Sequence, residues 1–403
     1  MQGIAEPRTQ SLLSRLPGSA GLLFLAMLPT TMLVPLQTEI MGKLSGTPRE
    51  MALFTSIAML GMVLLSPLAG YLSDRFRARR AFVVAFSLAN ACTFPLISLA
   101  PTLPILLVAR FLEGGTAAFV IGTLMACAED RERAEPQGRR GLAMGISGMM
   151  LGLGAALGMP IGGIIGRGNW HFAAYAASAL MMGVAILAIS LRDQVTQRER
   201  SNFTSILTLL QHPIALIPIC FAFVDRFVAG FLVGPFTWRL RDEFGLDPAQ
   251  AGRMLAYVML PMVLGAIPAA VAARKLGAVR LVLVGSIIYA VFIGVSGTLQ
   301  SAESVRLTLL IAGLGAGFLY SPSMVLAGRL APDGLTATAM SLYVGIGSLG
   351  FLLGPLVGVE IRTFLDRSLQ ENQFAALSWT MGSAALIPTI LLAVYWRRLR
   401  ALE

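Results

Sequence analysis

Charged residues are scarce in this chain of 403 residues. Asp, Glu, Lys and Arg make up 13% of it, whereas hydrophobic residues make up 56% and the mean hydropathy is +0.75. A soluble domain carries about 25% charged residues, so this composition cannot cover a surface that faces water. It excludes a water-soluble domain, and it also excludes a disordered or collagen-like chain.

Cysteine and histidine are rare as well, with three and two copies. Cys92, Cys127 and Cys220 each lie in or at the end of an apolar stretch, and they are interpreted as small packing residues. We therefore expect no disulfide framework, no metal site and no cofactor. The glycine-rich runs lack the following Lys-Ser/Thr of a phosphate-binding loop, which excludes ATP-driven transport by this chain. No cluster of nucleophile, base and metal ligands has a usable spacing, so an enzyme is not expected.

Long apolar stretches of about 20 residues recur along the chain, and each is long enough for a helix to cross about 30 Å of hydrocarbon. They predict an all-α membrane protein with twelve transmembrane helices. The polar first 17 residues lead into a run too long for a signal-peptide core, so we expect an uncleaved first span. The expected helices cover residues 18–40, 51–72, 81–100, 103–127, 141–166, 172–191, 213–237, 251–273, 281–300, 307–329, 335–359 and 374–396.

One long polar connection, residues 192–212, divides the spans into two sets of six, in residues 1–191 and 213–403. Arg and Lys are distributed unevenly over the connections, roughly 20 on one side against 8 or 9 on the other, so the positive-inside rule places both termini and this linker in the cytoplasm. The expected location is the cell inner (plasma) membrane. Because the basic residues lie in short clusters between apolar spans, the net charge of +10 indicates membrane-protein loops rather than binding of nucleic acid.

The two sets of six spans resemble each other. Glycine recurs every four residues in the fifth span, beside Pro160, and does so again 196 residues later in the eleventh span, beside Pro355. Two related bundles around a site near the midplane are typical of transporters. The glycine rows indicate close helix packing, and we expect the fifth span to pack against the eleventh while the bundles move. The rows are Gly154, Gly158 and Gly162, and Gly350, Gly354 and Gly358.

The connection after the second span, residues 70–80, carries a single carboxylate among several arginines. Its simplest interpretation is a positive-inside cluster. A second interpretation is a gate, because a carboxylate at a helix end can hold the positive N-terminus of a helix in the other bundle, and the arginines can hold neighbouring groups. Such contacts would close the cytoplasmic side while the cavity faces outward. The expected gate residues are Gly70, Asp74, Arg75, Arg79 and Arg80.

Residues 70–80, Gly-Tyr-Leu-Ser-Asp-Arg-Phe-Arg-Ala-Arg-Arg, resemble the signature between the second and third helices of the major facilitator superfamily. The superfamily has Gly at the place of Arg77 and usually a base at Ala78. Residues 110–114, Arg-Phe-Leu-Glu-Gly, resemble its fourth-helix signature, which has Gln at the place of Glu113. The fifth span resembles the superfamily's antiporter signature, although its proline is displaced by one position. The residues that carry this resemblance are Gly154, Gly158, Pro160, Gly162 and Gly163. The resemblance covers the whole chain and implies a drug:proton antiporter-like transporter of unspecified substrate.

Several charged residues lie within the apolar spans. Arg110 and Glu113 are three residues apart in the fourth span, hence on one helix face, and Asp225 and Arg226 lie near the middle of the seventh. Each charge at the bilayer centre costs about 2.5–3.5 kcal/mol, so these side chains must face one another or water. The resemblance implies that the first, fourth, seventh and tenth helices line the cavity. The charges are either a structural set of ion pairs or a site of proton coupling.

In the proton-coupling interpretation, a carboxylate in a cavity of low dielectric changes its proton affinity as an arginine or water approaches. Glu113 is the first candidate carrier, because the superfamily signature has a neutral residue there, and Asp225 is the second. Arg110 would modulate the carrier, and Arg226 would be either an ion-pair partner or an anchor for an anionic substrate. The other expected substrate contacts are Gln37, Glu39, Phe227, Phe231 and Tyr320, although packing roles are common for phenylalanines in such spans.

These observations predict a monomeric secondary transporter whose partners are a small-molecule substrate, protons and the lipid bilayer. The favoured activity is export of a drug-like compound or metabolite in exchange for protons by alternating access. Three alternatives stay open: export of a siderophore-like anionic metabolite, import of a metabolite by a proton symporter or facilitator, and a receptor or scaffold without flux.

Overall fold

The computed structural model describes residues 18–42, 44, 47–76, 78–134, 142–191, 208–209, 211–332, 336–366 and 373–395. The first 17 residues, the last eight, most of the expected linker 192–212 and the side chain of Asp74 lie outside this description, so the expectations placed on them stay predictions. Throughout the described ranges the regular structure is helical.

The first six-helix bundle is built from residues 18–188. Its first span is interrupted by a short 3₁₀ turn, η2 (Val34–Leu36), where Pro35 lies. A proline lacks the backbone N–H that continues a helix, which explains the break. The elements are α1 (Gly18–Met32), η2, α2 (Gln37–Gly42), α3 (Pro48–Phe76), α4 (Arg79–Leu99), α5 (Leu103–Ala134), α6 (Leu142–Ile165) and α7 (Trp170–Ala188).

The second bundle begins at residue 213 and repeats this plan. Its first span is interrupted by a π-helical segment, η4 (Leu232–Phe236), which contains Pro235. The elements are α9 (Pro213–Phe231), η4, α10 (Thr237–Asp242), α11 (Pro248–Leu276), α12 (Ala278–Ser296), α13 (Ala302–Arg329), α14 (Thr336–Asp366) and α15 (Gln373–Val394).

Eleven helical segments among the described residues are long and apolar enough to cross a membrane, and α11, with 29 residues, occupies the place of the remaining expected span. The prediction of an all-α protein with twelve transmembrane helices is therefore confirmed. Several helices are longer than expected, for example α3 with 29 residues and α5 with 32. At 1.5 Å per residue they are more than about 40 Å long, so their ends project beyond the hydrocarbon layer.

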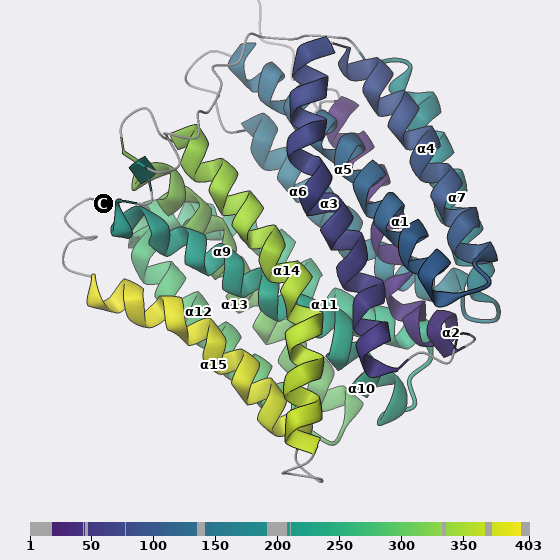
Figure 1. The fold of residues 1–403 in the computed structure, drawn as a ribbon. Coiled ribbons are helices and arrows are strands. Elements are labelled where there is room, and N and C mark those ends of the chain that lie inside the picture. Colours follow the sequence, from purple (N-terminus) through teal and green to yellow (C-terminus); the bar gives the residue numbers. More distant parts are fainter. Residues whose placement is uncertain are drawn as a thin grey trace, which may run out of the picture.

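Helices pack mainly within their own bundle, as the two colour groups of Figure 1 illustrate. One hydrophobic core lies among α1–α7 and another among α9–α15. The bundles meet along two helix pairs, α3 with α14 and α6 with α11. Val34 and Met159 of the first bundle pack into the core of the second, so apolar contact as well as polar contact joins the two.

The glycine rows pack each bundle against its own first span. A Cβ added at Gly162 would lie 2.0 Å from the Met32 carbonyl oxygen of α1, and one added at Gly350 would lie 2.1 Å from the Phe223 carbonyl oxygen of α9. The glycines therefore let the backbones of α6 and α1, and of α14 and α9, approach closely.

The expected contact between the fifth and eleventh spans is wrong. The fifth span, α6, packs on α1 and α11, and the eleventh, α14, packs on α9 and α3. On α6, a different glycine faces the other bundle: a Cβ at Gly163 would lie 2.3 Å from the Pro248 carbonyl oxygen of α11. A glycine row reveals a face of close packing, and several helices can use such a face.

Candidate transport site

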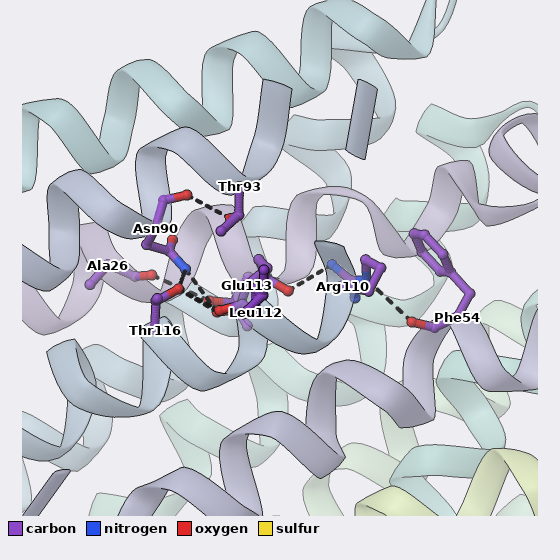
Figure 2. A network of polar contacts seen from close by, with 9 residues as sticks. Ala26, Phe54, Asn90, Thr93, Arg110, Leu112, Glu113 and Thr116 are labelled. Atoms are coloured by element: carbon purple, nitrogen blue, oxygen red, sulfur yellow. Dashed lines mark hydrogen bonds and ion pairs between the residues drawn. The ribbon is translucent and has the colours of Figure 1, made fainter. Parts of the chain in front are cut away.

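Arg110 and Glu113 form an ion pair inside the first bundle. Both lie on α5, one turn apart, with 2.9 Å between Arg110 Nη1 and Glu113 Oε2, and their side chains are 2% and 0% exposed. Arg110 Nε donates to the Phe54 carbonyl oxygen of α3 at 3.2 Å, and the guanidinium lies 4.4 Å from the centre of the Phe54 ring. Figure 2 shows the pair within this network. Neither charge faces lipid, which is what the cost of burial requires.

The other oxygen of the Glu113 carboxylate is different. Oε1 is fully buried and has no hydrogen-bond partner among the described residues. Asn90 of α4 stabilises the helical turn that contains Glu113. Its Nδ2 donates to the Glu113 carbonyl oxygen and to Thr116 Oγ1, both at 2.8 Å (Figure 2). An ionised oxygen buried without a donor is unfavourable by about 1–3 kcal/mol or more, whereas a protonated carboxyl is neutral.

The two charged residues in the middle of α9 do not form such a pair. Asp225 and Arg226 are neighbours on α9, so their side chains leave the helix about 100° apart. Asp225 is 4% exposed. Arg226 is half-buried, and its Nη1 donates to the Val344 carbonyl oxygen of α14 at 3.0 Å while Nη2 donates to the Tyr320 hydroxyl of α13 at 3.4 Å. These hydrogen-bond partners are neutral.

Tyrosines surround this arginine. The Arg226 guanidinium lies 6.0 Å from the centre of the Tyr320 ring, and the rings of Tyr320 and Tyr343 are 6.3 Å apart. Tyr343 is buried, and its hydroxyl is 2.9 Å from Ser323 Oγ of α13. The expected substrate residues Arg226 and Tyr320 are therefore brought together, and Tyr343 is a neighbour that the sequence reasoning missed.

The two phenylalanines expected beside Arg226 have different surroundings. Phe227 is half-buried and stacks on Phe223 with ring centres 6.0 Å apart. Phe231 is fully buried in the core of the second bundle, 5.9 Å from the Phe236 ring. Phe231 therefore has no exposed surface to offer a substrate in this conformation.

Gln37 and Glu39 lie between the bundles, at the point where both first spans are broken. Gln37 Nε2 donates to the Val233 carbonyl oxygen in η4 at 3.1 Å, and Gln37 is fully buried. Glu39 forms an ion pair with Arg241 of α10. Figure 1 shows α2 and α10 near each other at this end of the molecule. Both residues thus join the bundles instead of facing an open cavity.

Further contacts between the bundles lie at the same end. Arg49 Nε is 2.7 Å from Glu360 Oε1, and Arg167 Nη2 is 2.9 Å from Asp247 Oδ2. We call this the latched end, defined by the ion pairs Glu39–Arg241, Arg49–Glu360 and Arg167–Asp247. The sequence reasoning missed these pairs. Their only signal is that basic and acidic residues of the two bundles fall in connections on the same side.

The opposite end carries the expected gate residues. Arg75 Nη1 donates to the Tyr71 hydroxyl and Arg79 Nη1 to Ser73 Oγ, each at 2.8 Å, so these contacts stay within the first bundle. A side chain at Gly70 would meet open space. Arg80 is exposed, and the side chain of Asp74 is outside the described residues. Polar contacts that join the bundles among the described residues include the ion pairs of the latched end, a bond from Arg241 Nε to Thr38 Oγ1 at 3.4 Å, the Gln37–Val233 bond and a bond from Ser56 Oγ to the Leu352 carbonyl oxygen at 2.9 Å.

Two pseudo-symmetric six-helix bundles that span a membrane are the architecture of a membrane transporter. The chain belongs to the Major Facilitator Superfamily, whose sequence profile matches residues 20–224 and 215–402. It is therefore a multi-pass membrane protein of a family of small-molecule transporters, not of enzymes.

Known relatives are distant. The chain is 28% identical over 153 residues to the uncharacterized MFS-type transporter YfiU of Bacillus subtilis, a match that covers 37% of this chain and 28% of that protein. It is 21% identical to Multidrug resistance protein 1 of the same organism over 83% of this chain and 86% of the relative. Among solved structures, a mutant of the peptide transporter POT in complex with sulfate has a TM-score of 0.76 and 15% identity, with 98% of this chain and 97% of that chain covered. This likeness supports the fold alone.

Proposed function

We propose that the protein is a proton-coupled antiporter of the inner membrane that exports a small organic molecule by alternating access. The observation that carries the proposal is the sealed Arg110–Glu113 pair, in which one carboxylate oxygen has no partner among the described residues. The antiporter-like glycine row of α6 and the distant relative named as a multidrug resistance protein favour export.

Glu113 is the proposed proton carrier. When it binds a proton, Arg110 loses its counter-charge but keeps the Phe54 carbonyl oxygen and the Phe54 ring. The arginine is therefore held in both states, so the proton can leave and return without dismantling the site. Asp225, buried in the other bundle, is the second candidate.

The positive-inside orientation assigns the latched end to the outside. With both termini in the cytoplasm, these ion pairs close the outer side in this conformation, as is required of an exporter that is ready to load cargo from the cytoplasm. The role of residues 70–80 as a cytoplasmic gate belongs to the opposite conformation, in which the latched end opens. Gln37 and Glu39 are accordingly proposed as outer-gate residues.

The test uses a monomeric preparation reconstituted in vesicles, with ethidium and 2-naphthalenesulfonate as probes. An antiporter accumulates a probe in vesicles that are acidic inside, a symporter in vesicles that are alkaline inside, and a facilitator in neither. We expect accumulation with an acidic interior and its loss in Glu113→Gln. The matched control is Glu303→Gln, which alters an exposed i,i+3 ion pair with Arg306. If Glu113→Gln accumulates the probe in response to the gradient as the wild type does, Glu113 is not the proton carrier. If wild-type vesicles accumulate neither probe in response to the gradient, the proposal of proton coupling is wrong.

A further inference from the structure

The chemical class of the cargo can be approached through Arg226, which interacts electrostatically with its neighbour Asp225 but has no carboxylate at ion-pair distance in the described part of the chain. Arg110, Arg239 and Arg241 each have a carboxylate partner. Among the described residues the hydrogen-bond partners of Arg226 are neutral, the Val344 carbonyl oxygen and the Tyr320 hydroxyl. A guanidinium offers five N–H donors in a planar fork suited to a carboxylate, so Arg226 retains donors for an anion.

Arg226 donates to α14 at a stretch of that helix that is exposed. Val344, Ser348 and Leu352 are four residues apart, so they lie on one face of the helix. At Leu352 that face touches the first bundle through the bond from Ser56. About two turns farther from the latched end, Val344 is 49% exposed. The Val344 carbonyl oxygen, which accepts from Arg226, therefore lies on an exposed stretch of α14 away from its contact with the first bundle.

The surroundings of Arg226 include a closely packed glycine and two aromatic side chains. Gly347 of α14 lies beneath the guanidinium, since a Cβ there would be 2.7 Å from Arg226 Nη1. Phe223, three residues before Arg226, lies on the same face of α9 and is half-buried. The Tyr320 ring centre is 6.0 Å from the guanidinium. A charged group next to aromatic rings matches a molecule with an anion at one end and an aromatic body at the other.

Resting on the proposed transport function, we infer that Arg226 and Tyr320 form the anion subsite of the cargo, which carries a single oxyanion, a carboxylate or a sulfonate, on an aromatic body. Arg226 pairs with the oxyanion through its free donors, and the tyrosine hydroxyl fixes the plane of the guanidinium. Phe223 and Tyr320 contact the ring. Because the subsite lies away from the latched end on α14, cargo can occupy it without breaking those ion pairs.

Equilibrium binding to the full chain in nanodiscs tests this subsite in the absence of any proton gradient. The probes are 2-naphthalenesulfonate and its neutral amide, 2-naphthalenesulfonamide, with empty nanodiscs to subtract partition into lipid. We expect the wild type to bind the anion at least tenfold more tightly than the amide. Arg226→Gln is expected to abolish this preference, Arg226→Lys to keep part of it because one charge remains, and the control Arg306→Gln to leave it unchanged.

Equal affinity of the wild type for the two probes, no measurable binding of either at millimolar concentration, or an unchanged preference in Arg226→Gln overturns the assignment. If Arg226→Gln does not give a monodisperse preparation, Arg226→Lys decides. A lysine ammonium has no planar fork, so a full wild-type preference in that variant argues against bidentate pairing. The outcome is independent of proton coupling. A preserved anion preference with no response to a pH gradient contradicts the antiport proposal alone. Transport that responds to the gradient, without any anion preference in binding, contradicts the subsite alone.

Discussion

The two bundles hold the same pair of charges in opposite ways. In the first, Arg110 and Glu113 bind each other inside a buried network. In the second, Asp225 and Arg226 diverge from one helix, and the arginine reaches a half-exposed surface with neutral partners. A sealed pair responds only to something as small as a proton, whereas an arginine with free donors can receive a larger anion. The difference suggests that proton binding and cargo recognition are divided between the bundles.

The largest predicted effect breaks the sealed pair. Arg110→Ala leaves the Glu113 carboxylate buried without a counter-charge, which should destabilise the protein by about 3–5 kcal/mol. Thermal unfolding of the purified protein in detergent measures the loss. The double variant Arg110→Ala/Glu113→Gln should recover much of the stability, because no buried charge remains. Arg226→Ala should have a smaller effect, and equal losses at the two arginines would contradict the contrast between the bundles.

A second prediction concerns the close glycine packing that both bundles show. Gly162→Ala and Gly350→Ala each place a Cβ within about 2 Å of a backbone oxygen, at Met32 and Phe223 respectively. Each should cost about 1–3 kcal/mol through overpacking, and the two losses should be similar because the packing is repeated. Gly145→Ala is the control on α6, since its Cβ would meet nothing within 4 Å. A loss at Gly145 as large as that at Gly162 would remove the close-packing explanation.

The smallest predicted effect concerns the hydrogen bond that joins Gln37 of the first bundle to Val233 of the second. Gln37→Leu removes the hydrogen bond to the Val233 carbonyl oxygen, which Thr237 Oγ1 continues to satisfy at 3.0 Å. The lost bond contributes about 1 kcal/mol, so opening of the latched end should increase about fivefold. The readout is the rate at which an impermeant maleimide labels a cysteine introduced at Ser56, which is 1% exposed. An unchanged rate would show that Gln37 does not hold this end closed.

Much of this fold was accessible from the sequence, because a lipid-spanning helix must be a continuous apolar run. The pairing of Arg110 with Glu113 was also accessible, since side chains three residues apart share a helix face. The contacts between helices that are distant in the sequence could not be predicted in this way. The Arg49–Glu360 contact joins residues 311 positions apart, and no local pattern relates them. The same limit explains Phe231, because its spacing from Phe227 indicated a shared face but not which neighbours bury it.

The division of roles between the bundles is tested most directly by comparing two transport modes in one Glu113→Gln preparation. In vesicles, exchange of labelled for unlabelled 2-naphthalenesulfonate reports cargo handling, and uptake driven by an acidic interior reports proton coupling. We expect exchange to persist at the wild-type rate while gradient-driven uptake falls to the level of empty vesicles. Loss of both activities together, in a variant that remains folded, would contradict the separation of the proton site from the cargo site.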